Sequence, residues 1–142
     1  MNLALTNKIM ESNKKLLEQA EIEYCKPSFE VNKFSSQIGD SRFSFQILKS
    51  EASLLIVIGV EGADRFVDLS LAMPTSYDRM PIVTSILGDS TSNISSNFAK
   101  RISHVLGKPV FISFNATADR LVLPLLEKNL IQQIKDNPSL FK

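Results

Sequence analysis

The sequence has few of the residues that build reactive centres and cross-links. Its 142 residues include one cysteine, Cys25, one histidine, His104, and no tryptophan. A lone cysteine excludes a disulfide within the chain and is typical of proteins from reducing compartments. The N-terminus has no basic flank and no sustained apolar stretch, so no secretory signal is expected there. We therefore expect a cytoplasmic protein, with the nucleus as a further location.

The chain also lacks a charge excess and a long apolar run. Sixteen basic and fifteen acidic side chains leave a formal charge of +1. No block of like charges is present, so a nucleic-acid partner is not indicated. The longest apolar run, Leu54–Val60, is about a third of the roughly 20 residues that a membrane-spanning helix needs. The run is typical of a buried strand, and no membrane partner is expected.

No set of residues has the spacing of a metal, cofactor or nucleophile site. Cys25 has no partner base nearby in the sequence, and His104 is expected on the surface in the last turn of a helix, where it complements the helix dipole. Residues 88–92 lack the lysine-serine pair of a phosphate-binding loop, so Asp89 is expected to cap the following helix rather than to lie beside an anion. The aspartates are dispersed, without calcium-loop spacing: Asp64, Asp68, Asp78, Asp89 and Asp119. We predict no enzyme activity, no cofactor, no metal and no small-molecule substrate.

Hydrophobic periodicity predicts six β-strands. The clearest alternation is that of Phe43, Phe45 and Ile47 with the polar residues between them. In the first strand the apolar positions change parity, which predicts a β-bulge near residues 32–33. The predicted strands are residues 29–38, 42–48, 53–60, 66–73, 81–87 and 110–114.

Two main helices are predicted in the second half of the chain. Residues 94–105 carry one apolar stripe and are followed by Gly107 and Pro109, which is typical of a helix end. Residues 119–135 carry leucines and an isoleucine at helical spacing. Residues 6–23 have a thin apolar face, so residues 1–28 are expected to form an extension that is helical or partly disordered. Residues 29–142 are expected to form one domain.

These elements predict an α+β fold with a mostly antiparallel six-stranded sheet and the two main helices packed on one face. The first four strands have short connections, which predicts antiparallel pairing between successive strands. The strands at residues 54–60 and 110–114 have apolar residues on both sides. We therefore expect the other face of the sheet, or an edge, to be used for dimerisation.

One stretch, residues 77–89, resembles a family signature. A Tyr-Asp pair is followed by proline, then by Thr-Ser, leucine and Gly-Asp, and this order is similar to that of the proteasome assembly chaperone 4 family. The likeness extends over residues 29–141. The residues that carry it are Tyr77, Asp78, Pro81, Thr84, Ser85, Leu87, Gly88 and Asp89.

The resemblance implies a non-catalytic chaperone of the proteasome core particle. Such a protein forms a heterodimer with a related type-3 assembly chaperone and binds α-type subunits, chiefly the fifth, while the α-ring forms. It is released as β-type subunits join, and no nucleotide is needed. We select Tyr77, Asp78, Thr84 and Ser85 as candidate protein-binding residues, because an exposed Tyr-Asp loop beside a polar strand can supply an aromatic anchor and hydrogen bonds. Local stabilisation of a turn and a strand is the competing interpretation of these four residues.

Two other functions fit parts of the sequence. A small hydrolase or transferase could use Thr84 or Ser85 as nucleophile, but it would need His104 or a lysine close by. A homodimeric protein-binding adaptor with the same fold and unrelated cargo would need no catalytic residues. Co-purification separates the adaptor from the chaperone, since the adaptor would carry no proteasome subunits.

Overall fold

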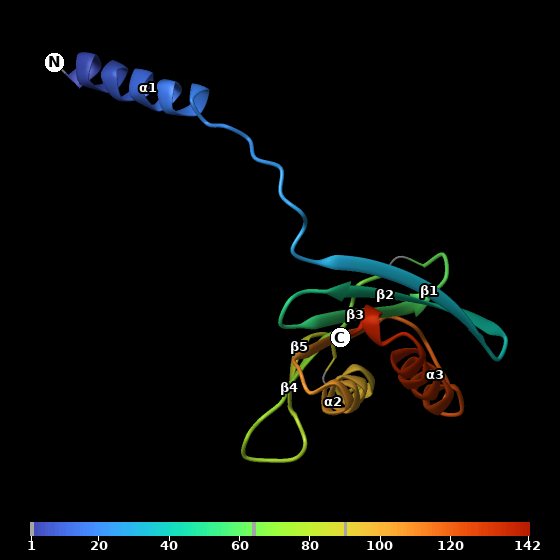
Figure 1. The fold of residues 1–142 in the computed structure, drawn as a ribbon. Helices are drawn as coiled ribbons and strands as arrows, with labels where there is room; N and C mark the ends of the chain where they lie inside the picture. Colours follow the sequence, from blue (N-terminus) through green and yellow to red (C-terminus); the bar gives the residue numbers. More distant parts are fainter. Residues whose placement is uncertain (1, 64, 90) are drawn as a thin grey trace.

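The chain folds into a six-stranded sheet with two helices on one face (Figure 1). The computed structural model describes residues 2–63, 65–89 and 91–142, and only the backbone of Leu17. Asp64 and Ser90, which belong to two of the segments considered above, lie outside the described residues. The elements in chain order are α1 (Asn2–Glu18), β1 (Glu30–Ile38), β2 (Ser41–Lys49), β3 (Leu54–Val60), β4 (Leu69–Met73), β5 (Ile82–Leu87), α2 (Ile94–Leu106), β6 (Val110–Phe114), α3 (Val122–Asp136) and the 3-10 turn η1 (Pro138–Leu140).

The sheet order is β1-β2-β3-β6-β4-β5, with every neighbouring pair antiparallel except β3 and β6. The predicted fold class, mostly antiparallel with helices on one face, is confirmed. The expected pairing of β3 with β4 is wrong, because β6 lies between them and runs parallel to β3. Strand β6 thus lies in the middle of the sheet, with a strand on each edge, although it comes last in the sequence.

The β-bulge predicted near residues 32–33 is also wrong. The register of β1 on β2 is continuous from Glu30↔Lys49 to Ile38↔Ser41. Phe34 stacks on Phe45 with ring centroids 4.7 Å apart, whereas Val31 lies on the other side of the strand with 59% of its surface exposed. The parity change therefore reflects apolar residues on both faces. The irregularity of the sheet lies instead between β4 and β5, at Leu69/Ser70.

Strand β4 turns its small residues, and not its large ones, toward the helices. Ser70 and Ala72 are fully buried, and the Ser70 hydroxyl lies 2.8 Å from that of Ser95 on α2. Small side chains here let the helix approach the strand closely, and the paired hydroxyls satisfy each other in the buried contact. Leu71 and Met73 consequently fall on the face away from the helices, where Met73 is half exposed.

The hydrophobic core lies between the sheet and the two helices. Its β2 side chains, Phe43, Phe45 and Ile47, are at most 1% exposed, as the alternation predicts. Helix α2 ends at Gly107, which has a left-handed φ of 68° and donates its N–H to the Ser103 carbonyl over 2.8 Å. The core is closed by Phe141, a fully buried residue after η1 that the sequence did not indicate. The remaining large core residues are Ile38, Leu54, Ile56, Ile58, Phe98, Ile102, Val110, Ile112, Phe114, Leu126, Leu130 and Ile134.

Helix α1 stands away from the sheet at the end of an extended segment (Figure 1). Its large apolar side chains whose surroundings are described are more than half exposed: Leu3, Leu5, Ile9, Met10 and Leu16. Within the described parts of the chain, no helix combines the length and apolar character needed to cross a bilayer.

Candidate protein-binding surface

The loop between β4 and β5, residues 74–81 and here named the Tyr77 loop, presents a tyrosine to solvent. The Tyr77 side chain is 98% exposed. The N–H of Tyr77 donates to Thr75 Oγ1 over 3.2 Å, and the N–H of Met80 donates to Asp78 Oδ1 over 3.3 Å. Asp78 therefore shapes the turn that projects Tyr77. The structure brings these two predicted residues together in one loop.

His104 holds this loop against helix α2. Its Nδ1 lies 3.1 Å from the carbonyl oxygen of Arg79. The predicted position of His104 in the last turn of a helix is confirmed, but this contact was missed. His104 and Arg79 are 25 residues apart in the sequence, so no local spacing could have indicated their contact. Any assignment of His104 as a base for Thr84 or Ser85 must take account of its hydrogen bond to Arg79.

Thr84 and Ser85 lie on opposite faces of β5. Ser85 is paired with Ser70 on the face toward the helices, whereas Thr84 is paired with Leu71 on the uncovered face. Thr84 lines a hollow of about 360 Å³ together with Leu71 and Met73, and the base of the Tyr77 loop forms its other wall. The structure therefore groups Thr84 with the Tyr77 loop and separates Ser85 from it.

A row of side chains crosses the uncovered face of the whole sheet. The strand registers place one residue from each strand side by side, and five of the six are large and apolar. Phe111 stands at the centre, with Leu55 on one side and Leu71 on the other. We name this set the open row, and it is Val31, Leu48, Leu55, Phe111, Leu71 and Thr84. A contiguous apolar surface of this kind is typical of a protein interface.

Gly88 and Asp89 have structural roles. Gly88 has φ 107°, and a Cβ at this position would lie 3.0 Å from Asp68 Oδ1 and 3.1 Å from the Val67 carbonyl oxygen. Asp89 was expected to cap α2, but its Oδ1 accepts the N–H of Thr91 over 3.0 Å, and the helix begins only after Asn93. Asp89 thus closes a turn ahead of the helix, and this hydrogen bond lowers the pKa of its carboxyl.

Comparison with solved structures defines the class of the fold. A chain in the crystal structure of a chaperone complex for yeast 20S proteasome assembly superposes with a TM-score of 0.60 over 78% of this chain and 94% of that chain. The identity is 10%, so this likeness concerns the architecture alone.

Sequence comparison defines the family. The family model for proteasome assembly chaperone 4 matches residues 42–116, more than half of the 142-residue chain. The human and mouse proteins named proteasome assembly chaperone 4 are 29% and 28% identical to it over 103 residues, which is 72% of this chain and 82% of each relative. The chain belongs to the proteasome assembly chaperone 4 family. The resemblance inferred from the motif at residues 77–89 is thereby confirmed.

Replacing Gly88 by alanine tests whether the glycine of the motif is structural. We expect Gly88→Ala to destabilise the fold more than Gly39→Ala, a matched control with φ 63° and open space around it. The left-handed backbone alone makes each change unfavourable by about 1–2 kcal/mol. Contact with Asp68 and Val67 adds about 1–3 kcal/mol for Gly88→Ala. Urea unfolding of both variants measures the difference, and equal destabilisation would contradict the contact.

Replacing His104 tests whether it restrains the Tyr77 loop. We expect His104→Ala to speed amide hydrogen exchange in residues 75–80 by about fivefold, the factor that corresponds to a net hydrogen bond of about 1 kcal/mol. The amide nitrogen of asparagine can replace Nδ1, so His104→Asn should restore most of the protection. Unchanged exchange in His104→Ala would show that the loop does not need this contact.

Proposed function

We propose that this chain is a non-catalytic chaperone for assembly of the proteasome core particle. It forms a heterodimer with a related type-3 assembly chaperone and binds α-type subunits, chiefly the fifth, while the α-ring is built in the cytoplasm or nucleus. It leaves as β-type subunits join. Membership of the proteasome assembly chaperone 4 family supports the role, and the open row is the observation that carries the mode of action.

The open row fits a long-lived partner of similar shape. Five large apolar residues side by side on a flat sheet face, with Phe111 at the centre, match the apolar character of permanent interfaces. A second sheet packs face to face on such a surface about 10 Å away, as in a sandwich. We therefore assign the five apolar residues of the open row to the type-3 chaperone, whose related fold would supply the second sheet, and leave Thr84 at the end of the row to a second partner.

The Tyr77 loop fits a partner that binds and then leaves. It is polar and exposed, and it carries one aromatic side chain on a turn shaped by Asp78 and held by His104. An exposed tyrosine can dominate the affinity of a small interface, because its large surface is buried on binding while its hydroxyl keeps a hydrogen bond. We assign this loop and the adjoining Thr84 to the α-type subunit, with Ser85 contributing from the helix side of β5.

Release follows from competition for this small surface. A chaperone that binds one arrangement of subunits more tightly than others shifts the assembly equilibrium toward it. When β-type subunits claim an overlapping surface, the short-lived loop contact is lost while the permanent heterodimer persists. No cofactor takes part in this sequence of events.

A lysine next to Phe111 in the open row should abolish heterodimer formation. Leu71 is half-buried in the isolated chain and borders solvent, so Leu71→Lys should still fold, but pairing would bury its charge against apolar side chains. We expect binding of the type-3 chaperone to weaken at least 100-fold, roughly 3 kcal/mol. The matched control is Leu121→Lys, at an 85% exposed leucine near α3. Co-expression followed by native mass spectrometry measures the pairing, and a normal heterodimer with Leu71→Lys would refute the assignment.

Recovery of the tagged chain with its bound partners from the protein's own cells separates the chaperone from the adaptor. A tagged wild-type chain should carry one related small chaperone and α-type subunits. Recovery of the chain with only itself and unrelated cargo would favour the homodimeric adaptor instead.

Removing the exposed tyrosine should weaken capture of the α-type subunit and leave the heterodimer intact. For Tyr77→Ala we expect about a 30-fold loss of affinity, the equivalent of a 2 kcal/mol anchor. Tyr77→Phe should retain most of the affinity if the ring supplies the contact. Phe66→Ala, at a half-exposed aromatic residue outside the loop, is the control. Titration of the purified heterodimer with the fifth α-type subunit measures the loss, and unchanged affinity for Tyr77→Ala would exclude the loop from the interface.

A further inference from the structure

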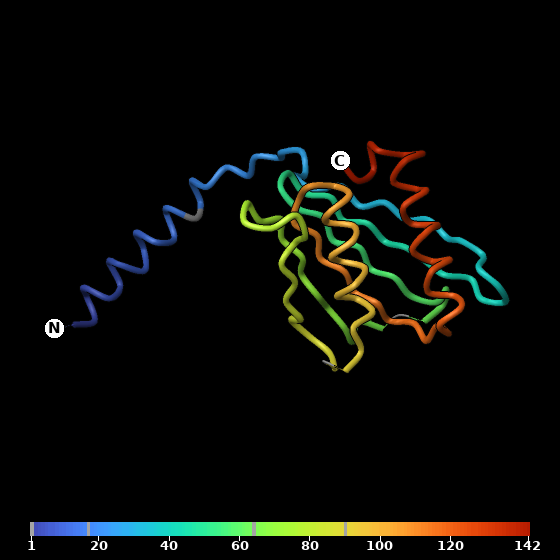
Figure 2. The backbone as a smooth tube through the Cα atoms, turned by 90° about the horizontal axis from the view of Figure 1, so that it is seen from below, coloured from blue at the N-terminus to red at the C-terminus, as the bar shows by residue number. Residues whose placement is uncertain are grey.

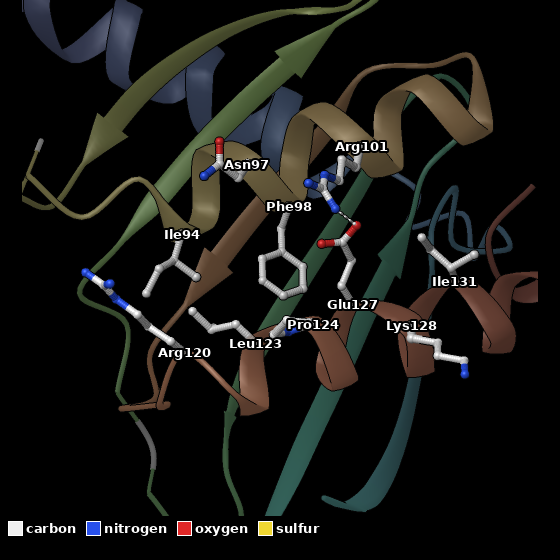
Figure 3. A pocket seen from close by; sticks show the side chains of 10 residues that line it. All are labelled: Ile94, Asn97, Phe98, Arg101, Arg120, Leu123, Pro124, Glu127, Lys128 and Ile131. Carbon is white, nitrogen blue, oxygen red and sulfur yellow. Dashed lines mark hydrogen bonds and ion pairs between the residues drawn. The ribbon is translucent and has the colours of Figure 1, made fainter.

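A groove of about 500 Å³ lies between α2 and α3, on the helical side of the molecule and away from the open row. Figure 3 shows Ile94 and Phe98 of α2 on one side and Leu123 of α3 on the other, with Ile131 toward the far end. The two helices run in the same direction along the groove (Figure 2), and its apolar lining includes Ile94, Phe98 and Leu123, with Ile131 beyond the Arg101–Glu127 pair.

Positive charge predominates on the rim of this groove. Arg101 forms an ion pair of 2.6 Å with Glu127, the one carboxylate among the described lining residues. Arg120 and Lys128 add two further cations, and the labelled side chains in Figure 3 show them at opposite ends. Three cations against one carboxylate favour an occupant that is apolar where it meets the floor and acidic where it meets the rim.

The segment between α1 and β1 has this chemistry. In residues 21–24, Glu21 and Glu23 alternate with Ile22 and Tyr24, so an extended chain presents the two acids on one side and the two apolar residues on the other. Ile22 is 81% exposed and Tyr24 96% exposed. Burial of such side chains against an apolar surface within reach lowers the free energy of the chain.

The segment enters the domain at the end where α2 and α3 finish, and the groove begins further along these helices, near Arg101 and Ile131. Lys49 Nζ lies 3.1 Å from Glu30 Oε2 and 2.7 Å from the Ser139 carbonyl, so the start of β1 is tied to the chain that follows α3. Figure 2 shows the segment joining β1 at the end of the molecule where α2 and α3 both finish. The six residues from Tyr24 to Glu30 can span up to about 20 Å. Lys128, in the groove, lies about 12 Å along α3 from its end at Asp136. The reach of the segment therefore exceeds the distance from the end of α3 to Lys128.

Further positive charge marks this entry. Burial and, to a smaller extent, the nearby charge of Lys49 lower the pKa of Lys108. The entry therefore carries two lysines, Lys49 and Lys108, and Lys49 is paired with Glu30.

We propose that residues 21–24 dock in the α2–α3 groove of the same chain, with Ile22 and Tyr24 on the apolar floor and Glu21 and Glu23 beside the basic rim. The structure displays the undocked arrangement. Because the segment is tethered by a few residues, its effective concentration at the groove is about millimolar, and a weak contact is enough to populate the docked arrangement. Docking also brings α1 to the helical side, away from the open row.

Cys25 provides the probe for a direct test, since it is the single cysteine and is exposed next to Tyr24. A nitroxide attached to Cys25 of the full chain broadens the amide NMR signals of residues near it. Docking predicts the strongest broadening along the groove, at Phe98, Arg101 and Lys128. A free tether predicts broadening confined to the entry, around Gly107 and Ser139, and this result would overturn the proposal.

Charge reversal tests the basis of the docking. The double variant Glu21→Lys/Glu23→Lys should reduce the broadening at Phe98 and Lys128 at least fivefold. The matched control Glu11→Lys/Glu18→Lys makes the same change in charge within α1 and should leave it unaltered. Equal broadening in the two double variants would refute the role of the acids.

A mixed sample identifies the chain that supplies the segment. Nitroxide-labelled chains without ¹⁵N are mixed with ¹⁵N chains that carry no nitroxide. Broadening in the groove of the ¹⁵N chains would show that a second copy supplies the segment, which contradicts docking within one chain. The proposal requires no groove broadening in the mixture.

Discussion

The central strands of this sheet are apolar on both faces, while the two packed helices cover only one. Strand β4 adds to this imbalance, because its small residues Ser70 and Ala72 lie on the side toward the helices. The large residues of β4 are thereby displaced to the uncovered face, where Leu71 joins Phe111 and Leu55 in one row. The uncovered apolar row is a property of the fold itself, and it is the physical basis of the pairing proposed above.

Local patterns predicted the elements well because each is determined by its own residues. The alternation of Phe43, Phe45 and Ile47 placed β2, and Gly107 with its left-handed φ marked the end of α2. The order of the strands was less accessible. Nothing in the sequence of β6 states that it lies between β3 and β4, since pairing over more than 35 residues depends on which arrangement buries most surface. The burial of Phe141 is not predictable for a similar reason, because an isolated phenylalanine after a turn belongs to no periodic pattern.

The candidate site was found through the family motif and not through chemistry, and the structure divides that motif by role. Gly88 and Asp89 shape the backbone ahead of α2, whereas Tyr77 is displayed to solvent. Thr84 and Ser85 are neighbours in sequence, yet strand parity sends them to opposite faces. The contact of His104 with the Arg79 carbonyl connects elements that are distant in the sequence. Local sequence patterns do not predict this contact, for the same reason that they do not predict the position of β6.

The insertion of β6 also has a consequence for how the chain folds. Strands β1 to β3 form one antiparallel unit of short-range contacts, and β4 with β5 forms a second. The two units do not pair with each other, because β6 lies between them. During synthesis neither unit has its β6 neighbour until residues 110–114 have been made, so early strand pairing is confined to each unit. The strand at residues 110–114 joins the two units into one sheet.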